Sequence, residues 1–207
     1  AYGQLPARIT DSLPWQEVAV DLIGPWTVNY LNDTYAFNAL PCIDVATGFP
    51  EAIRITNKTA SHIATQFENS WLARYPQPNR CIHDQGNEFV GFEFQEMLRL
   101  SGIQDVPITV RNPQANAICE RMHQTITKSL RILIHEHPPN NIANIAELVD
   151  SALATSLHAI RSTVHSTLGV SPSALVFHRD MLHDIPIQPN FERIQVKRQA
   201  LIDSNLR

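Results

Sequence analysis

Strand-like segments fill the first half of this chain, and helical patterns dominate the second half. Short β-branched runs that end at glycine, proline or aspartate predict strands, and apolar residues spaced three or four apart predict helices. Strands are expected at residues 17–23, 35–44, 51–56, 81–83 and 103–108. Helices are expected at 59–74, 92–101, from 118 to the Pro138-Pro139 pair, and at 142–161, 172–177 and 191–206. This order predicts an α/β layer fold, with a five-stranded mixed sheet flanked by helices. The first three strands should form an antiparallel meander, and the last helix a C-terminal extension.

The composition is that of an ordinary globular domain, with 207 residues, of which 43% are hydrophobic and 17% charged. No apolar run approaches the ~20 residues that span a bilayer, and the N-terminus lacks the apolar segment of a signal peptide. Cys42, Cys81 and Cys119 lie far apart, which favours free thiols in a reducing compartment. The net charge of −4 counts against nucleic-acid binding, unless bound cations offset part of the acidic charge.

Three acidic residues occupy places where an α/β fold builds its sites. Asp21 lies in the first predicted strand, Asp84 follows the fourth, and Glu120 lies in the first turn of the helix expected from residue 118. By itself Glu120 could simply complement the helix dipole. Strand ends and helix starts converge on one edge of the sheet, however, and carboxylates gathered there would repel one another unless divalent cations bound them. Two such ions about 3.5–4 Å apart can drive phosphodiester chemistry.

The spacing of these residues and the words around them resemble one family. Residues 85–119, which number 35, separate Asp84 from Glu120. The segments VAVDLIGPW, IHDQGNEF and NPQANAICERMHQTI resemble the three catalytic motifs of retroviral and LTR-retrotransposon integrases, the DDE family, and in particular its gypsy type. STVHSTLGVSPSALVFHR resembles the segment that follows the core in gypsy-type elements, and YGQLPAR resembles the linker from an N-terminal zinc-binding domain. The resemblance covers about residues 2–187.

This resemblance implies an RNase H-like fold and a polynucleotidyl transferase that trims the 3′ ends of element DNA and joins them to target DNA. Asp21, Asp84 and Glu120 would be catalytic and would hold two Mg²⁺ or Mn²⁺ ions, with Asp21 between the ions. The implied partners are element-end DNA, target DNA and further copies of the chain in a dimer or tetramer, without a membrane. The place of action would be the nucleus, within a complex that moves there from the cytoplasm. The expected division is a linker at 1–14, a catalytic core at 15–180 and a helical extension at 181–207.

The resemblance also assigns contacts with DNA. Asn116 matches a loop residue that contacts element-end DNA, and Asn87 matches a position that faces target DNA. Further residues follow Glu120 on the polar side of its helix and suit the DNA backbone; these are Gln124, Thr127, Lys128 and Arg131. Each could equally be an ordinary solvated polar residue.

The sequence departs from the family pattern at three places, none of them in the acidic triad. Ala117 stands where the family usually has glycine, and Asn112 where it often has histidine. Gln124 stands where a basic residue is common, which removes one expected phosphate contact. Asp44 also ends a predicted strand and could be a fourth ligand, but its position before Ala46-Thr47-Gly48 favours a turn-forming role.

Two other functions compete with an active integrase core. One is a domesticated or decayed remnant that binds DNA or protein without catalysis, for which the changes at Ala117 and Gln124 leave room. The other is a different nuclease on the same fold, which the 35-residue gap and the flanking words disfavour.

Overall fold

The computed structural model describes residues 13–31, 33–107, 113–165, 169–183 and 185–205. Its strands are β1 (Glu17–Val20), β2 (Ile23–Tyr30), β3 (Asp33–Asp44), β4 (Pro50–Ile55), β5 (Arg80–His83) and β6 (Gln104–Pro107). Its helices are α1 (Ala60–Phe67), the π-helical turn η1 (Glu68–Leu72), α2 (Asn87–Val90), α3 (Phe92–Leu100), α4 (Pro113–Glu136), α5 (Ile142–Ser162), α6 (Pro172–Phe177) and α7 (Phe191–Asn205). None of the helices in these ranges has both the length and the hydrophobicity to cross a membrane.

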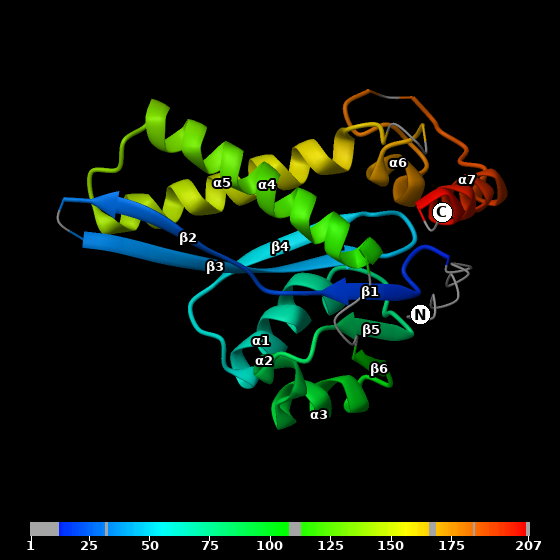
Figure 1. Ribbon diagram of the computed structural model, residues 1–207, viewed down its shortest axis with the longest axis horizontal. Coiled ribbons are helices and arrows are strands. Elements are labelled where there is room, and N and C mark those ends of the chain that lie inside the picture. Colours follow the sequence, from blue (N-terminus) through cyan, green and yellow to red (C-terminus); the bar gives the residue numbers. More distant parts are fainter. Residues whose placement is uncertain (1–12, 32, 108–112, 166–168, 184, 206–207) are drawn as a thin grey trace, which may run out of the picture.

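The strands form one mixed sheet centred on the long strand β3 (Figure 1). β1 and β2 lie end to end along one edge of β3, and β4 pairs with its other edge, all antiparallel to it. β5 pairs in parallel with β1, and β6 pairs in parallel with β5. The predicted α/β fold with a mixed sheet is therefore confirmed. Within the described ranges the sheet has six strands, one more than the sequence analysis expected.

The extra strand is β2, of which only Ile23 lies within the segment expected as a strand at 17–23. β1 stops at Val20, Asp21 and Leu22 lie between the strands, and β2 runs through Gly24-Pro25 instead of ending there. The pairing register shifts between Ile23 and Trp26 at that point. Gly24 has a φ of +113°, and a Cβ on it would lie 2.7 Å from the carbonyl oxygen of Phe37. A bulge accommodates both glycine and proline inside a strand, so their presence did not mark its end.

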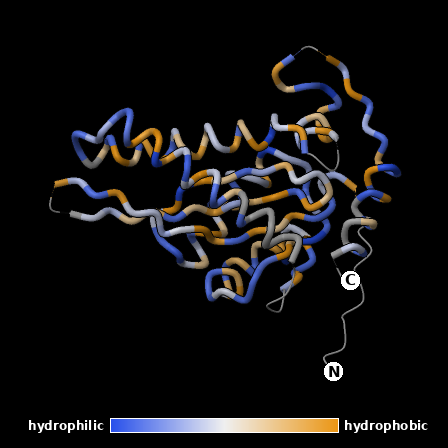
Figure 2. Tube along the Cα trace, turned by 45° about the horizontal axis from the view of Figure 1, so that its top comes forward, coloured by the Kyte–Doolittle hydropathy of each residue, from blue (hydrophilic) through white to orange (hydrophobic). Residues whose placement is uncertain are grey.

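Different helices cover the two faces of the sheet (Figure 1). Along the strands and along α4 and α5, hydrophobic residues recur between hydrophilic ones, as the colours of Figure 2 show. Side chains of α1, η1 and α3 pack on one face, against Val18, Val20 and Cys81. Side chains of α4 and α5 pack on the other face, against Ile23, Trp26 and Ile43. The predicted apolar side of the long helix is confirmed, because Met122, Ile126 and Leu130 are buried in this second core and Leu133 packs against it.

Helix boundaries follow local signals in most cases. Thr59 caps α1 by accepting a hydrogen bond from the His62 N–H at 3.3 Å, and Ser171 caps α6 with proline in the next position. The long helix α4 is the exception, because it begins at Pro113 and not at residue 118. Proline suits a first helical position, where its missing N–H would have no partner in any case. Residues 113–117 were therefore wrongly expected to be a loop; residues 108–112 lie outside the described part.

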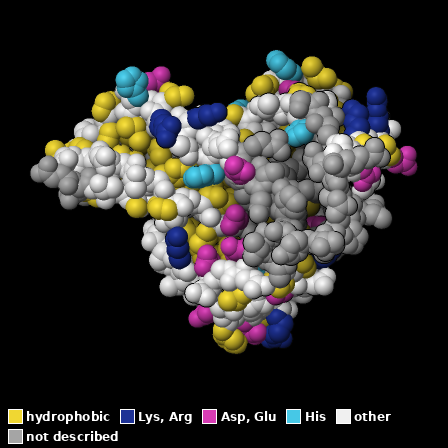
Figure 3. Space-filling view, viewed as in Figure 1, with side chains coloured by type: hydrophobic (Ala, Val, Ile, Leu, Met, Phe, Trp, Pro, Cys, Tyr) yellow, Lys and Arg dark blue, Asp and Glu magenta, His cyan; other side chains and the backbone are white. Residues whose placement is uncertain are grey.

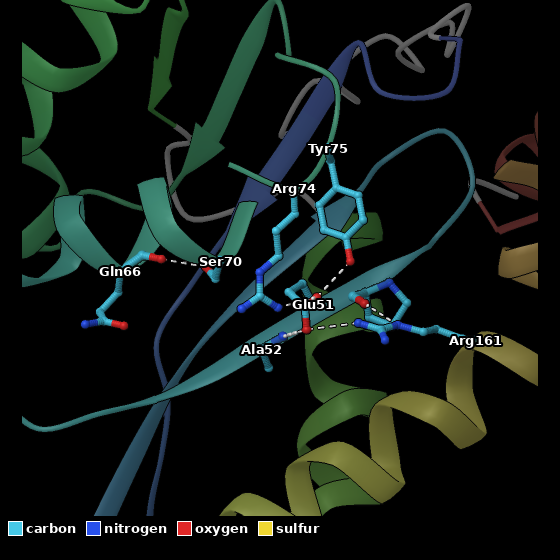
Figure 4. Close-up of polar contacts among 8 residues, drawn as sticks. Glu51, Ala52, Gln66, Ser70, Arg74, Tyr75 and Arg161 are labelled. Atoms are coloured by element: carbon cyan, nitrogen blue, oxygen red, sulfur yellow. Dashed lines mark hydrogen bonds and ion pairs between the residues drawn. The ribbon is translucent and has the colours of Figure 1, made fainter. Parts of the chain in front are cut away.

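A charged cluster around the buried Glu51 joins the central sheet to α5 (Figure 4). The Glu51 carboxylate of β4 accepts a hydrogen bond from the Tyr75 hydroxyl at 2.8 Å and lies 2.9 Å from Nη2 of Arg161, on the last turn of α5. Arg74 approaches the same carboxylate at 3.8 Å. Arg161 also donates to the carbonyl of Pro50, so polar bonds hold β4 and α5 together.

Candidate active site

Asp21 and Asp84 are brought together by the register of two parallel strands. Ala19 of β1 pairs with Ile82 of β5. Continuing that register by two residues places Asp21 opposite Asp84, each just beyond the end of its strand. Neighbouring strands lie about 4.8 Å apart, so the two aspartates are side by side at the carboxyl edge of the sheet. Because side chains alternate along a strand, both belong to the side of the sheet that α4 covers.

Each of these aspartates accepts a local hydrogen bond from the backbone. Asp21 Oδ1 accepts from the N–H of Leu22 at 2.7 Å, and Asp84 Oδ1 accepts from the N–H of Gly86 at 3.0 Å. Asp21 is partly exposed and Asp84 is exposed. Exposed carboxylates at adjacent positions are oxygen donors of the kind that hard divalent cations prefer, and these two residues fit such an ion.

Glu88 is a third carboxylate in this region and was not among the site residues predicted from the sequence. A Cβ built on Gly86 would lie 2.9 Å from the Glu88 carboxyl group and 3.0 Å from Asp84 Oδ1. Both acidic groups therefore border the same glycine, and a side chain at that position would disturb them. The signal was present in the sequence as the Asp-x-Gly-x-Glu pattern within IHDQGNEF.

Glu120 lies on α4, is exposed, and is the eighth residue of that helix. The expectation that Glu120 lies in the first turn is therefore wrong. It is too far from the helix start to interact with the helix dipole, whose effect fades within one turn. Figure 3 shows acidic side chains gathered on this face, between the region of α4 and that of α1 and α2. Among the described residues no group of three His, Cys, Asp or Glu side chains is close enough to hold a metal ion. The structure brings Asp21 and Asp84 together but does not gather Glu120 into a three-ligand group with them.

Asp44 is a structural residue. Its side chain is buried, Oδ1 accepts from the Trp15 N–H at 2.8 Å, and Oδ2 accepts from the N–H and the hydroxyl of Thr47. The expected turn-forming role is confirmed, because these bonds close the turn between β3 and β4.

The residues expected to contact DNA have different environments. Asn87 begins α2, whereas Gln124, Lys128 and Arg131 lie along α4, and all four are exposed. Asn116 lies in the first turn of α4, and its side chain is outside the described part. The Thr127 hydroxyl accepts from Trp26 Nε1 at 2.9 Å and donates to the His123 carbonyl at 2.8 Å, so it holds β2 against α4.

The chain resembles retroelement integrases in sequence. It is 24% identical over 172 residues to human gypsy retrotransposon integrase-like protein 1, covering 83% of this chain and 32% of that protein. It is 26% identical over 131 residues to the Pol polyprotein of transposon 412 from Drosophila melanogaster, covering 62% of this chain and 10% of that polyprotein. The chain therefore spans at most about a third of these relatives. No family model matches the sequence.

Solved structures decide the fold. The HTLV-2 integrase catalytic core domain in complex with magnesium superposes with a TM-score of 0.59 at 17% identity, covering 79% of this chain and 97% of that one. The chain has the fold of an integrase catalytic core. A chain of the simian T-cell lymphotropic virus intasome superposes with a TM-score of 0.66 at 20% identity, covering 89% of this chain and 63% of that one. These superpositions confirm the predicted RNase H-like fold.

Proposed function

We propose that this chain is the catalytic core of a retroelement integrase, which processes the 3′ ends of element DNA and joins them to target DNA. The observation that carries the proposal is the β1–β5 register, which sets Asp21 beside Asp84 at one sheet edge of an integrase-like fold. The sequence relatives, which are named as integrase or Pol proteins, support the same activity.

The proposed reaction has two steps, and in each of them an oxygen nucleophile attacks a phosphodiester of DNA. Water first attacks a phosphodiester near the end of element DNA, and the bond to the neighbouring 3′ oxygen breaks, which leaves a 3′-hydroxyl. That hydroxyl then attacks a target phosphodiester, so that one P–O bond forms while another breaks. Because the number of bonds is conserved, the reaction needs no energy-supplying cofactor.

The residues of this chain have separate proposed tasks. Asp21, Asp84 and Glu120 would hold two Mg²⁺ or Mn²⁺ ions, with Asp21 and Asp84 already in adjacent positions. When bound, such ions supply charge stabilisation for the attacking and leaving oxygens. The exposed side chains of Asn87, Gln124, Lys128 and Arg131 would orient DNA, and so would Asn116. Thr127 would act indirectly, by fixing α4 on β2.

We further propose that the active form is a homo-oligomer on element-end and target DNA and acts in the nucleus. One solved neighbour is an intasome chain, and another neighbour, HTLV-2 integrase, is described in dimeric and trimeric forms.

A DNA disintegration or nicking assay with Mn²⁺ or Mg²⁺ tests the proposal. The wild-type chain should cleave and rejoin a branched oligonucleotide only when the metal is present, and Asp84→Asn should abolish this activity. Asp150→Asn is the matched control, because Asp150 is an exposed aspartate on α5 that pairs with Arg54 at 2.7 Å. Equal activity in wild type and Asp84→Asn would overturn the proposal.

A non-catalytic remnant that binds DNA or protein is the second candidate. It is favoured by the lack of a three-ligand group in the described part of the chain and by Gln124 in a commonly basic place. This candidate predicts DNA binding by the wild-type chain, no metal-dependent cleavage, and no effect of Asp84→Asn on either measurement.

A further inference from the structure

His83 is a buried polar residue directly before Asp84, and the proposed chemistry does not use it. It ends β5, and its side chain has no exposed surface. The imidazole packs between aromatic rings, with centroids 5.3 Å from Phe89 and 5.8 Å from Phe94. A polar ring in such a place is costly unless its nitrogens are hydrogen-bonded.

Both ring nitrogens of His83 have partners. Nδ1 lies 2.5 Å from the backbone carbonyl oxygen of Asp84, and Nε2 lies 2.5 Å from Oδ1 of Asp105 on β6. A carbonyl oxygen can only accept, so Nδ1 donates. Nε2 and Asp105 Oδ1 form the second contact of the ring. With both nitrogens bound, the ring is held in one orientation.

Strand pairing explains how Asp105 reaches His83. In the parallel β5–β6 register, Cys81 pairs with Asp105 and His83 with Pro107. Asp105 is therefore the diagonal neighbour of His83 on the same face of the sheet, within the reach of such pairs. The negative charge of Asp105 is also felt at Cys81, where burial first and this charge second raise the pKa of the thiol.

We infer that His83, held by Asp105, is a positioning residue that fixes the main chain at Asp84. The inference rests on the proposed function, because it assigns His83 a role through the metal-binding aspartate. The Asp84 side chain is exposed at a strand end and, among the described residues, accepts a hydrogen bond from the N–H of Gly86 in the next loop. The His83 ring supplies an anchor from the buried side, on the carbonyl of the same residue. Residues that orient metal ligands through hydrogen bonds commonly change metal affinity about 10–100-fold when they are removed.

An alternative is that the His83–Asp105 pair only stabilises the sheet. The two interpretations differ in what they predict for substitutions of Asp105, whose side chain is 34% exposed and so tolerates change. Asp105→Asn keeps a bridge, because its amide nitrogen can donate to Nε2 of a neutral ring while Nδ1 still donates to Asp84. Asp105→Ala removes the bridge. Comparing them separates the hydrogen bond from the charge, because both variants lack the carboxylate.

Binding of Mn²⁺ alone to the whole chain, followed by electron paramagnetic resonance, tests the inference. Asp105→Ala should weaken Mn²⁺ binding about tenfold, and Asp105→Asn should stay close to wild type. Asp150→Ala, which removes an exposed aspartate far along the chain, should not change it. In DNA strand transfer, Asp105→Ala should lower kcat and leave the KM for DNA unchanged.

The outcomes separate this inference from the proposed function. If Asp84→Asn binds Mn²⁺ as well as wild type does, the proposed active site is wrong. If Asp84→Asn loses binding but Asp105→Ala keeps wild-type affinity, the positioning role is wrong and the pair is only structural. Equal weakening in Asp105→Asn and Asp105→Ala would also overturn it, because the charge of Asp105 and not the bridge would then set the affinity.

Discussion

Aspartates that look alike in the sequence have different tasks because their surroundings differ. Asp44 is fully buried and its carboxylate closes a turn, whereas Asp84 is exposed and accepts one local bond from a backbone N–H. A buried carboxylate is tolerated only when several donors satisfy it, and a carboxylate so occupied is poorly placed to bind an ion. Burial and hydrogen-bond partners thus separate structural from candidate catalytic acids.

Gln124 is the residue at which DNA affinity can be tested most directly. It is exposed on α4, one turn beyond Glu120. Gln124→Lys should tighten binding to all DNA sequences and steepen the slope of log affinity against log salt by about one unit, because one more phosphate is neutralised. Titrations over a range of salt measure both quantities. An unchanged slope would show that this part of α4 does not face the DNA backbone.

At the scale of elements, α4 is the piece that links the sheet to the proposed DNA-binding surface. Its apolar side packs on β2 and α5, and Thr127 adds a polar bond to Trp26 across this contact. Arg54 of β4 donates two hydrogen bonds to the Asp150 carboxylate of α5, at 2.7 and 3.0 Å. These bonds tie β4 to α5, so Arg54 also belongs to the packing of elements.

Thr127→Val tests whether this threonine is structural. The change keeps the side-chain shape but leaves Trp26 Nε1 without its acceptor, and Trp26 is only 5% exposed. Urea denaturation should show that Thr127→Val loses about 1–3 kcal/mol in the free energy of unfolding. Thr127→Ser keeps the hydroxyl and should retain most of the wild-type free energy of unfolding. DNA affinity under folding conditions should not change. A loss of DNA affinity in Thr127→Val with an unchanged free energy of unfolding would instead support the direct DNA contact that the resemblance implied for Thr127.

At the scale of the whole molecule, the cluster around Glu51 connects the sheet to the end of α5. Breaking a buried ion pair by removing one partner costs about 3–5 kcal/mol, because the other charge is left without compensation. We expect a loss of that size in the free energy of unfolding for Glu51→Ala, measured by urea denaturation. Glu96→Ala, which removes an exposed pair with Arg99, should have little effect. Similar losses in both variants would mean that the Glu51 cluster contributes no more to stability than a surface ion pair does.

The same cluster predicts a loss of stability at alkaline pH. Burial, and then the hydrogen bond to Glu51, raise the pKa of Tyr75 to about 12 from an ordinary value of 10.0. A group whose pKa is raised by folding stabilises the protein fully below its unfolded pKa, and that stabilisation is lost as pH rises through the folded one. The melting temperature should therefore fall between about pH 10 and pH 12, and it should fall less in Tyr75→Phe than in wild type. An equal fall in melting temperature in Tyr75→Phe and wild type would contradict this prediction. Tyr35→Phe is the control and should behave like wild type.

Much of the architecture follows from local sequence. The Thr59 and Ser171 caps depend on neighbours within a few residues, and so does the apolar side of α4, which the structure confirms. Asp84 was correctly expected to follow a strand. These features are local because capping and helical periodicity involve residues close along the chain.

What only the tertiary structure decided are relations between distant residues. The parallel register that sets Asp21 beside Asp84, the Trp26–Thr127 bond and the His83–Asp105 bridge each join segments from different elements. The sequence by itself determined which residue types stand at strand ends and helix faces, and hence the family that the chain resembles. Which of those residues share a site depends on strand pairing and burial, because hydrogen-bond partners and solvent exposure exist only once the chain has packed.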